Sequence, residues 1–585
     1  MNEKPPSIWK RPWNTPARAL AWFALLVGGG FIIICCFALI TEQGARGTEL
    51  IPAALLAAVA LSAVAVAGYF FVRWISSWRN LRRFLFVVVC LVTLIALAYA
   101  EENWRGKHAW QKYLSESEAK GEKFNLASLA PAPVPDEKNF ALTPLLKPAT
   151  DFTQGPTGVV WHDTNGLARL DKIKADLSPG RNTNDHLVLG SVEKGTLADV
   201  SACGEFYRGN TNYPQAPTTA TAVETILVAL GKFDPELKEL REAAAARPHS
   251  RFPIHYEAEP PWGILLPHLA RMKGLTTLCQ MHAMAELDTG RAAEAFEDLK
   301  LGLRLSDSIR DEPLLIDHLV RIATLAIDLQ TVREGLYRHA WTDGQLAELE
   351  TRLASLDLMS EYQLAMRGER ACEVGGLEFL RRQGFRSNPM DYLGSDEGGS
   401  SSTSTPPLNP IPSGWFYQNM LTISRMFQSF MIPIVDERAH RVFPEVAENG
   451  VRTLGKMRTG PYTIFAKLLL PALGKAMQRT ARMQTYVDAA NVACALERYR
   501  LANGKLPDAL EALAPAFIAR IPNDVIDGKA LRYRVKADGG YVLYSVGWNQ
   551  TDDGGELAWK ERNKETPTVD FTQGDWVWLM PARKS

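Results

Sequence analysis

Three long apolar runs near the start of the chain constrain its fold more than any other feature. Residues 19–40 and 50–72 contain no charged side chain, and residues 84–100 form a shorter run of the same kind. At 1.5 Å per helical residue, runs of this length match a hydrocarbon core of about 30 Å. Because an unpaired backbone group in lipid is costly, we predict three transmembrane helices within a membrane domain at residues 1–100.

The basic residues that flank these runs predict an orientation. Only Arg46 lies between the first two runs, whereas the other flanking basic residues precede the first run or separate the second from the third. By the positive-inside rule, the N-terminus is cytoplasmic and residues 101–585 lie on the other side of the bilayer. The other flanking residues are Lys4, Lys10, Arg11, Arg18, Arg73, Arg79, Arg82 and Arg83.

Composition bears on the partners of the chain. Among 585 residues, 65 basic side chains balance 65 acidic ones, so we expect a lipid bilayer as a partner but no nucleic acid. Four cysteines follow the apolar runs. In an oxidising compartment they form two disulfides, with three connectivities open, or remain buried free thiols. They are Cys203, Cys279, Cys372 and Cys494.

Beyond residue 100, the sequence predicts a mainly α protein that ends in a small α+β module. Stretches rich in proline, glycine and serine separate segments of helical periodicity. The predicted segments are a helix with a Pro-rich linker at 101–150, an irregular region with short strands at 151–217, a helical domain at 218–384, a disordered low-complexity loop at 385–413, an amphipathic helical segment at 414–471 and an α+β head at 472–585.

Helical patterns in this domain cover 262–287, 291–306, 312–336, 343–355 and 358–383, and Gly290 separates the first two. Small residues such as Ala292 and Ala295 favour a close approach of the two helices. This stretch resembles the second half of a tetratricopeptide repeat. The resemblance implies a helical hairpin, and a solenoid that binds partners on its concave face is one arrangement of such hairpins.

The end of the chain carries the most specific local pattern. A helical pattern stops at residues 503–504, a short helix follows at 506–513, residues 531–536 alternate between apolar and basic, and residues 538–540 read as a hairpin turn. This order, with the wording LERYRLANGKLPDALEAL and GGYVLYSVGWNQTDDGGE, resembles the globular head of the type II secretion major pseudopilins.

The pseudopilin resemblance implies the fold of a head and a setting. It implies a bacterial inner membrane protein with residues 101–585 in the periplasm. The chain departs from that family because about 470 residues precede the helix of the head, which excludes assembly into a pilus by the usual route.

The same resemblance implies a calcium site, because major pseudopilins often bind calcium in their C-terminal loop. The matching positions are Ser545, Asp552 and Asp553, with Asp570 as a further ligand. Calcium takes six to eight oxygen ligands, which clustered carboxylates and carbonyls supply. The alternative is that Asp-Asp-Gly-Gly forms a solvated turn.

No nucleophile elbow, phosphate loop, dinucleotide fingerprint or HExxH motif occurs in the sequence. His162 and Asp163 are candidate acid–base residues, although a hydrogen-bonded surface pair is favoured. Glu257 and Glu259 offer two carboxylates, as glycoside hydrolysis requires, but a solvated acidic loop is favoured. The adjacent Asp317-His318 falls within a helical pattern, where we expect a structural histidine.

We therefore predict a membrane-anchored envelope protein that binds other envelope proteins as an interaction or assembly factor, and no catalytic residues or cofactor are assigned. One alternative is an exported hydrolase or glycan-active enzyme whose site gathers distant residues such as His162, Asp163 and Glu257. The other is a membrane sensor or transporter component. The apolar runs contain no Asp, Glu, Lys, Arg or His, which argues against ion or proton conduction.

Overall fold

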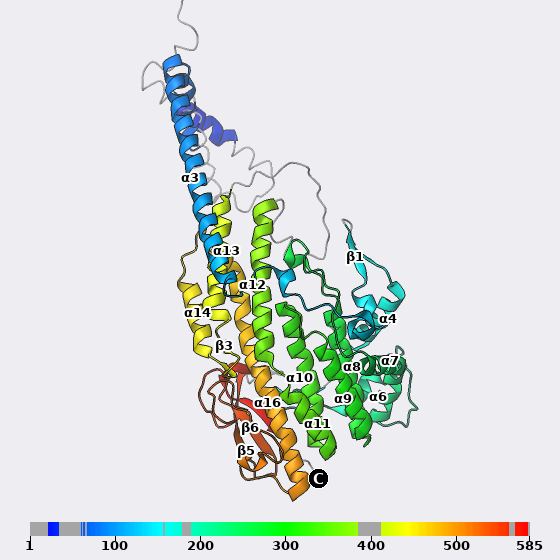
Figure 1. The fold of residues 1–585 in the computed structure, drawn as a ribbon. Coiled ribbons are helices and arrows are strands. Elements are labelled where there is room, and N and C mark those ends of the chain that lie inside the picture. The colour runs from blue at the N-terminus through cyan, green and yellow to red at the C-terminus, as the bar shows by residue number, and fades with distance from the viewer. Residues whose placement is uncertain are drawn as a thin grey trace, which may run out of the picture. The chain divides into compact units, whose positions relative to one another are not determined.

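The structure is a computed structural model that divides into two compact units, residues 1–101 and residues 102–585. Helices dominate the second unit, and its strands are short (Figure 1). The residues that the structure describes are 22–33, 60, 63–64, 67–68, 70–155, 158–177, 189–383, 411–560 and 568–582.

Elements are named in chain order. The principal α-helices are α3 (Trp78–Glu118), α4 (Thr164–Leu177), α5 (Val200–Tyr207), α6 (Ala222–Leu230), α7 (Asp234–Ala246), α8 (His268–Asp288), α9 (Ala292–Asp307), α10 (Leu315–Tyr337), α11 (Asp343–Ala354), α12 (Leu358–Gln383), α13 (Ser413–Met426), α14 (Pro444–Lys456), α15 (Ile464–Leu469) and α16 (Gly474–Asn503). The strands are β1 (Phe152–Gly155), β2 (Gly158–Trp161), β3 (Val435–Asp436), β4 (Arg441–Val442), β5 (Arg532–Val535), β6 (Tyr541–Ser545), β7 (Leu557–Lys560), β8 (Thr568–Gly574) and β9 (Trp576–Met580).

Among the described residues, one helix is long and apolar enough to cross a membrane, and that helix is α3. It contains the predicted run 84–100, whose side chains are almost all exposed. The helix Trp22–Ile33 is apolar but shorter than a span, and most of the run 50–72 lies outside the described residues. The prediction of three transmembrane helices is therefore not supported. The shortest run belongs to the longest of the described helices, because the charged segment after the run continues the same helix.

The helical domain follows the periodicity of the sequence closely. The helices α8 and α9 pack against each other as a hairpin, with Gly290 at φ +76° in the turn between them. Only glycine adopts that conformation without strain. The predicted patterns at 343–355 and 358–383 correspond to α11 and α12. The mainly α fold class is thus confirmed for this part of the chain.

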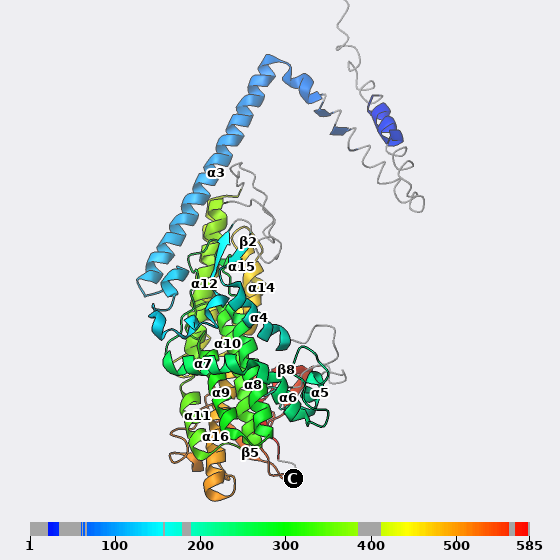
Figure 2. The same ribbon diagram turned by 90° about the vertical axis from the view of Figure 1, so that its right-hand side faces the viewer.

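Helix α16 lies at the centre of the second unit. Every residue from Thr480 to Glu497 is buried, because α10, α11, α12 and the strands β6 and β9 surround it (Figures 1 and 2). Gln484 is one polar side chain in this stretch that is paired: it accepts a hydrogen bond from the backbone of Leu358 and donates one to Asp488. The predicted head at 472–585 therefore shares a hydrophobic core with the helical domain.

A three-stranded antiparallel sheet, in the order β5-β6-β9, packs beside α16. The helix ends at Gly504, which is left-handed at φ +75°, and the hairpin between β5 and β6 turns at Gly539, at φ +88°. Both turns and the strand pair agree with the sequence pattern. A long helix with a small antiparallel sheet is thus present at the end of the chain.

The region 151–217 contains more helix than its composition suggests. The strands β1 and β2 form a hairpin in which Phe152 pairs with Trp161. Two helices follow, α4 and α5, which the glycine-rich and asparagine-rich sequence did not predict. Residues 384–410, most of the predicted disordered loop, lie outside the described residues.

The segment 414–471 was predicted to be amphipathic and to lie on the membrane or on the core. Helix α13 packs on α12 and buries Phe416, Met420 and Ile423, so this part lies on the core. Helices α14 and α15 instead leave Val451, Ile464 and Leu468 exposed.

Candidate functional site

The acid–base candidates do not form a catalytic pair. His162 Nδ1 lies 2.7 Å from Asp151 Oδ1, across the β1–β2 hairpin, and both side chains are partly exposed. Asp163 instead accepts a hydrogen bond from the backbone of Gly166 at 2.8 Å and so caps the start of α4. The two neighbours therefore serve separate local roles: His162 forms its surface pair with Asp151 and not, as predicted, with Asp163.

The acidic loop at 255–259 turns instead of extending. Glu259 forms an ion pair of 2.7 Å with Arg382, whereas Glu257 is exposed. Tyr256, which directly precedes Glu257 in the sequence, is buried and donates a hydrogen bond to the buried carboxylate of Glu312. The paired carboxylates that glycoside hydrolysis needs are not presented here.

Asp317 and His318 are both buried in α10. His318 Nε2 lies 2.9 Å from the hydroxyl of Thr480 on α16, and burial lowers the pKa of this histidine to about 3. The oxygens of Asp317 have no hydrogen-bond partner among the described residues, and burial raises its pKa to about 8. The histidine is structural, as predicted, whereas the buried carboxyl is a feature that the sequence did not reveal.

The four predicted calcium ligands occupy three different settings. Ser545 is fully buried and donates a hydrogen bond of 2.8 Å to Asp524. Asp570 accepts hydrogen bonds from the backbone and hydroxyl of Thr572 and lies 3.5 Å from Lys560. Only Asp552 and Asp553 share one loop, next to the buried Asp575.

Asp575 organises that acidic loop and was missed by the sequence analysis. Its carboxylate accepts hydrogen bonds from the backbone of Asp553 at 3.2 Å and of Gly555 at 2.6 Å. Arg532 contacts Asp524, Asp527 and Asp552 through 2.9, 2.5 and 3.6 Å ion pairs, so a guanidinium already balances much of the acidic charge. A calcium ion at Asp552 and Asp553 remains a prediction.

A second acidic cluster lies between α8 and α9. His282, Glu286 and Asp298 each offer one ligand atom, and these three atoms lie within 4.8 Å of one another. One imidazole and two carboxylates suit a divalent transition metal. His282 and Glu286 are about one helical turn apart on α8, so their side chains lie on the same face of that helix, whereas Asp298 comes from α9.

The charges around this cluster favour an ion network over a metal site. Arg241 pairs with Asp298, and Arg291 lies 4.0 Å from Glu286. His282 Nδ1 lies 2.6 Å from Asp298 Oδ2. Burial opposes the charged form of this histidine, but the hydrogen bond with Asp298 and the neighbouring carboxylates raise its pKa. Burial and the neighbouring Asp298 raise the pKa of Glu286 to about 7. A divalent ion here would have to displace two arginines.

An open pocket of about 390 Å³ lies where the ends of α10 and α16 meet the C-terminal sheet. We call it the head pocket. Its apolar wall includes Leu336, Leu506 and Met580, and its polar wall includes His339 and Arg500. Pockets of this size and mixed lining are typical ligand and peptide sites.

An ion network fixes the polar wall of the head pocket. Glu497 receives two hydrogen bonds from Arg500, at 2.7 and 2.8 Å, and lies 2.8 Å from His339 Nδ1. Burial opposes ionisation of Glu497, but these hydrogen bonds lower its pKa. The network presents fixed charge beside an apolar wall. No local motif announces this pocket, because its lining comes from four separated stretches of the chain.

Comparison with known proteins gives no further guide. No family model, curated protein or solved structure matches this chain. The pseudopilin and tetratricopeptide resemblances therefore rest on the sequence motifs alone, and the function must be argued from the sites.

Proposed function

We propose that this chain is a membrane-anchored envelope protein that binds other proteins at the head pocket. In this proposal α3 crosses a bacterial inner membrane, the N-terminus is cytoplasmic and residues 102–585 lie in the periplasm. The polar candidates for catalysis support a non-enzymatic role, because each is used in a cap, an ion pair or a buried network.

The head pocket is the observation that carries the proposal. It lies at the far end of α16, a helix of 30 residues that begins soon after α15 in the chain and ends beside the C-terminal sheet. Figure 1 shows α16 next to β5 and β6 of that sheet. At 1.5 Å per residue, about 45 Å separate the two ends of this helix. A membrane-anchored protein that presents a pocket at this distance from α15 is suited to meet soluble or neighbouring envelope proteins.

The surroundings of the head pocket suit a polypeptide. Val535, on the strand β5, lines the pocket and is 43% exposed, and β5 forms one edge of its sheet. Edge strands receive extended peptides through backbone hydrogen bonds, while neighbouring pockets select side chains. The apolar wall and the Glu497 ion network together would bind a peptide with one apolar and one charged side chain.

The test uses the full-length protein, purified from its native membrane in mild detergent after cross-linking, with mass spectrometry of the recovered proteins. The wild type should recover envelope proteins in stoichiometric amount. Val535→Glu should reduce that recovery about tenfold, because a charge in the apolar wall costs at least 1.4 kcal/mol of binding. Val228→Glu is the matched control, since Val228 is similarly exposed, at 40%, on α6.

Equal recovery by both variants, or a wild type that is recovered alone, would overturn the proposal. Deletion of residues 472–585 is not a suitable test, because it removes the central helix α16 together with the pocket. The hydrolase alternative gains no support from the described residues, since His162, Asp163 and Glu259 each serve a separate structural contact.

A further inference from the structure

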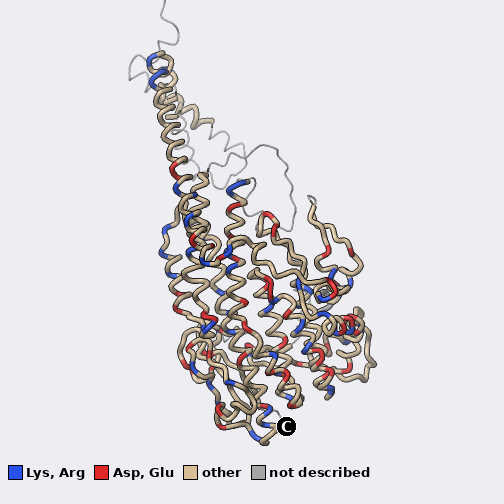
Figure 3. The backbone as a smooth tube through the Cα atoms, in the orientation of Figure 1, with Lys and Arg blue, Asp and Glu red and all other residues tan. Residues whose placement is uncertain are grey.

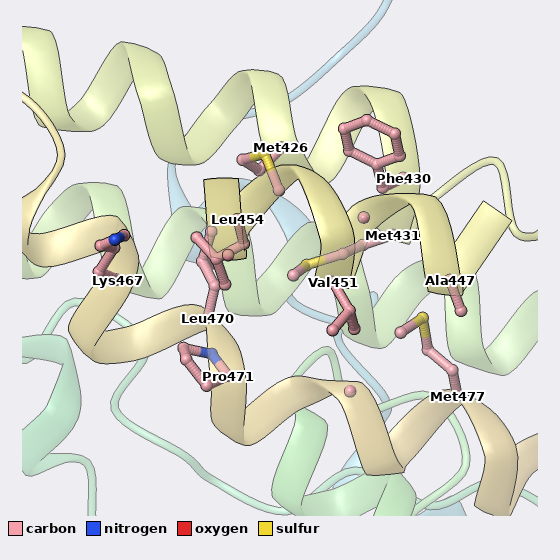
Figure 4. A pocket seen from close by; sticks show the side chains of 13 residues that line it. Met426, Phe430, Met431, Ala447, Val451, Leu454, Lys467, Leu470, Pro471 and Met477 are labelled. Atoms are coloured by element: carbon pink, nitrogen blue, oxygen red, sulfur yellow. The ribbon is translucent and has the colours of Figure 1, made fainter. Parts of the chain in front are cut away.

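A second, strongly apolar hollow lies at the other end of α16. It has a volume of about 450 Å³ and is bounded by α14, by α15 and the turn after it, and by the start of α16 (Figure 4). We call it the α14 hollow. Its lining includes Met431, Val451, Leu454 and Met477, and Lys467 is its one charged lining residue among those described.

The backbone and small residues explain why this space is open. Residues Phe427–Met431 form a π-helix at the end of α13, and π-helical turns are frequent at functional sites. A Cβ atom built at Gly455 or Gly474 would meet nothing within 4 Å. Methionines from three elements supply flexible apolar contacts that adapt to a ligand. The hollow is thus part of how these elements are built.

Chain connectivity keeps the α14 hollow close to any membrane that α3 crosses. Glu102 follows the apolar stretch by two residues in the same helix, and its carboxylate accepts a hydrogen bond of 2.7 Å from the hydroxyl of Tyr462. Arg105 donates a second hydrogen bond of 2.7 Å to that hydroxyl. Lys467 is five residues beyond Tyr462, so at 1.5 Å per helical residue it lies on the order of 10 Å away.

The charge of this region complements an anionic lipid. Residues 449–481 contain basic side chains but no acidic one, in a chain whose overall charge is zero. Figure 3 marks the basic residues of the chain in blue and the acidic ones in red. None of the basic side chains is buried. Exposed apolar residues accompany them, namely Val451, Ile464 and Leu468. Basic and apolar residues together are typical of surfaces that contact anionic membranes. The basic residues are Arg452, Lys456, Arg458, Lys467, Lys475 and Arg479.

We propose that the α14 hollow binds one acyl chain of an anionic phospholipid from the bilayer that α3 crosses, with the lipid phosphate at Lys467. The apolar lining excludes a polar ligand, and the volume falls within the range of about 300–1,000 Å³ typical of ligand sites. Lys467 Nζ lies 3.1 Å from the hydroxyl of Thr459, which holds the ammonium group at one end of the hollow (Figure 4). This site rests on the proposed membrane anchoring but is independent of the head pocket.

The probe is a phosphatidylglycerol with a photoreactive group on one acyl chain, mixed with unlabelled phosphatidylcholine in vesicles that contain the full-length protein. Peptide mapping after illumination should find cross-links in residues 84–100 and in the lining of the α14 hollow. Gly474→Leu fills the hollow and should reduce the hollow cross-links about tenfold. Gly344→Leu, at an open helical position in α11, is the matched control.

Two further comparisons keep the outcome decisive. Gly455→Leu fills the same space from α14, so it replaces Gly474→Leu should that variant fail to fold. Lys467→Gln should remove the preference for the phosphatidylglycerol probe over a phosphatidylcholine probe with the same chain. Cross-links in α3 but none in the hollow, or hollow cross-links that survive Gly474→Leu, would overturn the lipid site. An absence of cross-links in α3 would instead refute the membrane anchoring.

Discussion

Asp317 is a carboxyl in surroundings that do not suit its charged form. It is fully buried in α10, neither carboxylate oxygen has a hydrogen-bond partner among the described residues, and Glu312 lies close enough for the two charges to repel. A buried carboxyl in such a setting is neutral at physiological pH. Its raised pKa therefore makes the stability of the fold depend on pH.

We expect Asp317→Asn to flatten that dependence. Between the unfolded-state pKa of about 3.9 and the folded-state pKa of about 8, the folded protein alone keeps the proton. The free energy of unfolding therefore falls as pH rises, by up to about 1.4 kcal/mol per pH unit from this group. The asparagine side chain does not titrate in this range. The free energy of unfolding of the variant should therefore fall less steeply with pH than that of the wild type, by up to about 1.4 kcal/mol per pH unit.

Denaturant unfolding of the full-length protein in mild detergent, at several pH values in this window, measures the slope. Glu286 and Glu373 have raised pKa values of about 7 and about 8 and remain in both proteins, so only the difference between wild type and variant is informative. Asp311→Asn is the control, because Asp311 is exposed beside Arg310. An unchanged slope in Asp317→Asn would show that this carboxyl ionises freely.

At the scale of elements, close helix packing depends on a few glycines. A Cβ atom at Gly335 in α10 would lie 1.9 Å from the ring of Trp341, whose indole nitrogen donates a hydrogen bond to Val332. A Cβ atom at Gly368 in α12 would lie 1.6 Å from the carbonyl oxygen of Pro313. The turn that joins α10 to α11 therefore folds back tightly onto α10.

Gly335→Ala should destabilise the protein by about 1–3 kcal/mol, because overpacking forces Trp341 out of its position. The same change at Gly344 in α11 should be neutral or stabilise by up to about 1 kcal/mol, since no atom lies within 4 Å and alanine favours the helix. Thermal unfolding of the two variants side by side checks the contrast. Equal melting temperatures would contradict the packing argument.

The sequence predicted elements where local pattern decides and failed where distant contacts decide. Helix α12 was predicted at its observed bounds because apolar residues recur at helical spacing along it. Helices α4 and α5 were missed because glycine and polar residues dilute that signal, although Asp163 and Asp199 cap their starts. The head pocket was not predictable because residues from distant parts of the chain form it, where the ends of α10 and α16 meet the C-terminal sheet.

At the scale of the whole molecule, the helical domain and the C-terminal sheet are joined by the packing of α16 and by a buried arginine on α10. Arg333 on α10 is fully buried and donates hydrogen bonds to the carbonyl oxygens of Gly195, Thr196 and Leu579. Three segments that are far apart in the sequence thus meet at one guanidinium. A C-terminal head that folded independently of the helical domain would not share such a contact.

We therefore expect residues 102–585 to unfold as one cooperative unit. Deletion of residues 472–585 should leave a chain that is aggregated and rapidly cut by trypsin, because the apolar faces of α10, α11 and α12 lose the helix that covers them. Size-exclusion chromatography in mild detergent and limited proteolysis test this. A monodisperse, protease-resistant fragment ending near residue 471 would show that the head folds independently.

The proposed orientation across the membrane rests on residues on either side of the stretch 84–100. Arg79, Arg82 and Arg83 precede it and Glu101 and Glu102 follow it, so the positive-inside rule predicts that residue 102 and those after it lie outside the cytoplasm. Cysteine labelling tests this directly, because the four cysteines in the described part of the second unit are buried.

Ser77 and Ser115 are exposed positions before and after that stretch. A membrane-impermeant maleimide should label Ser115→Cys in intact spheroplasts, and Ser77→Cys only after the membrane is permeabilised, while the wild type gives the background. The reverse pattern would place the helical unit in the cytoplasm. Labelling of both positions without permeabilisation would mean that α3 does not cross the bilayer, and the lipid site beside Tyr462 would then lose its physical basis.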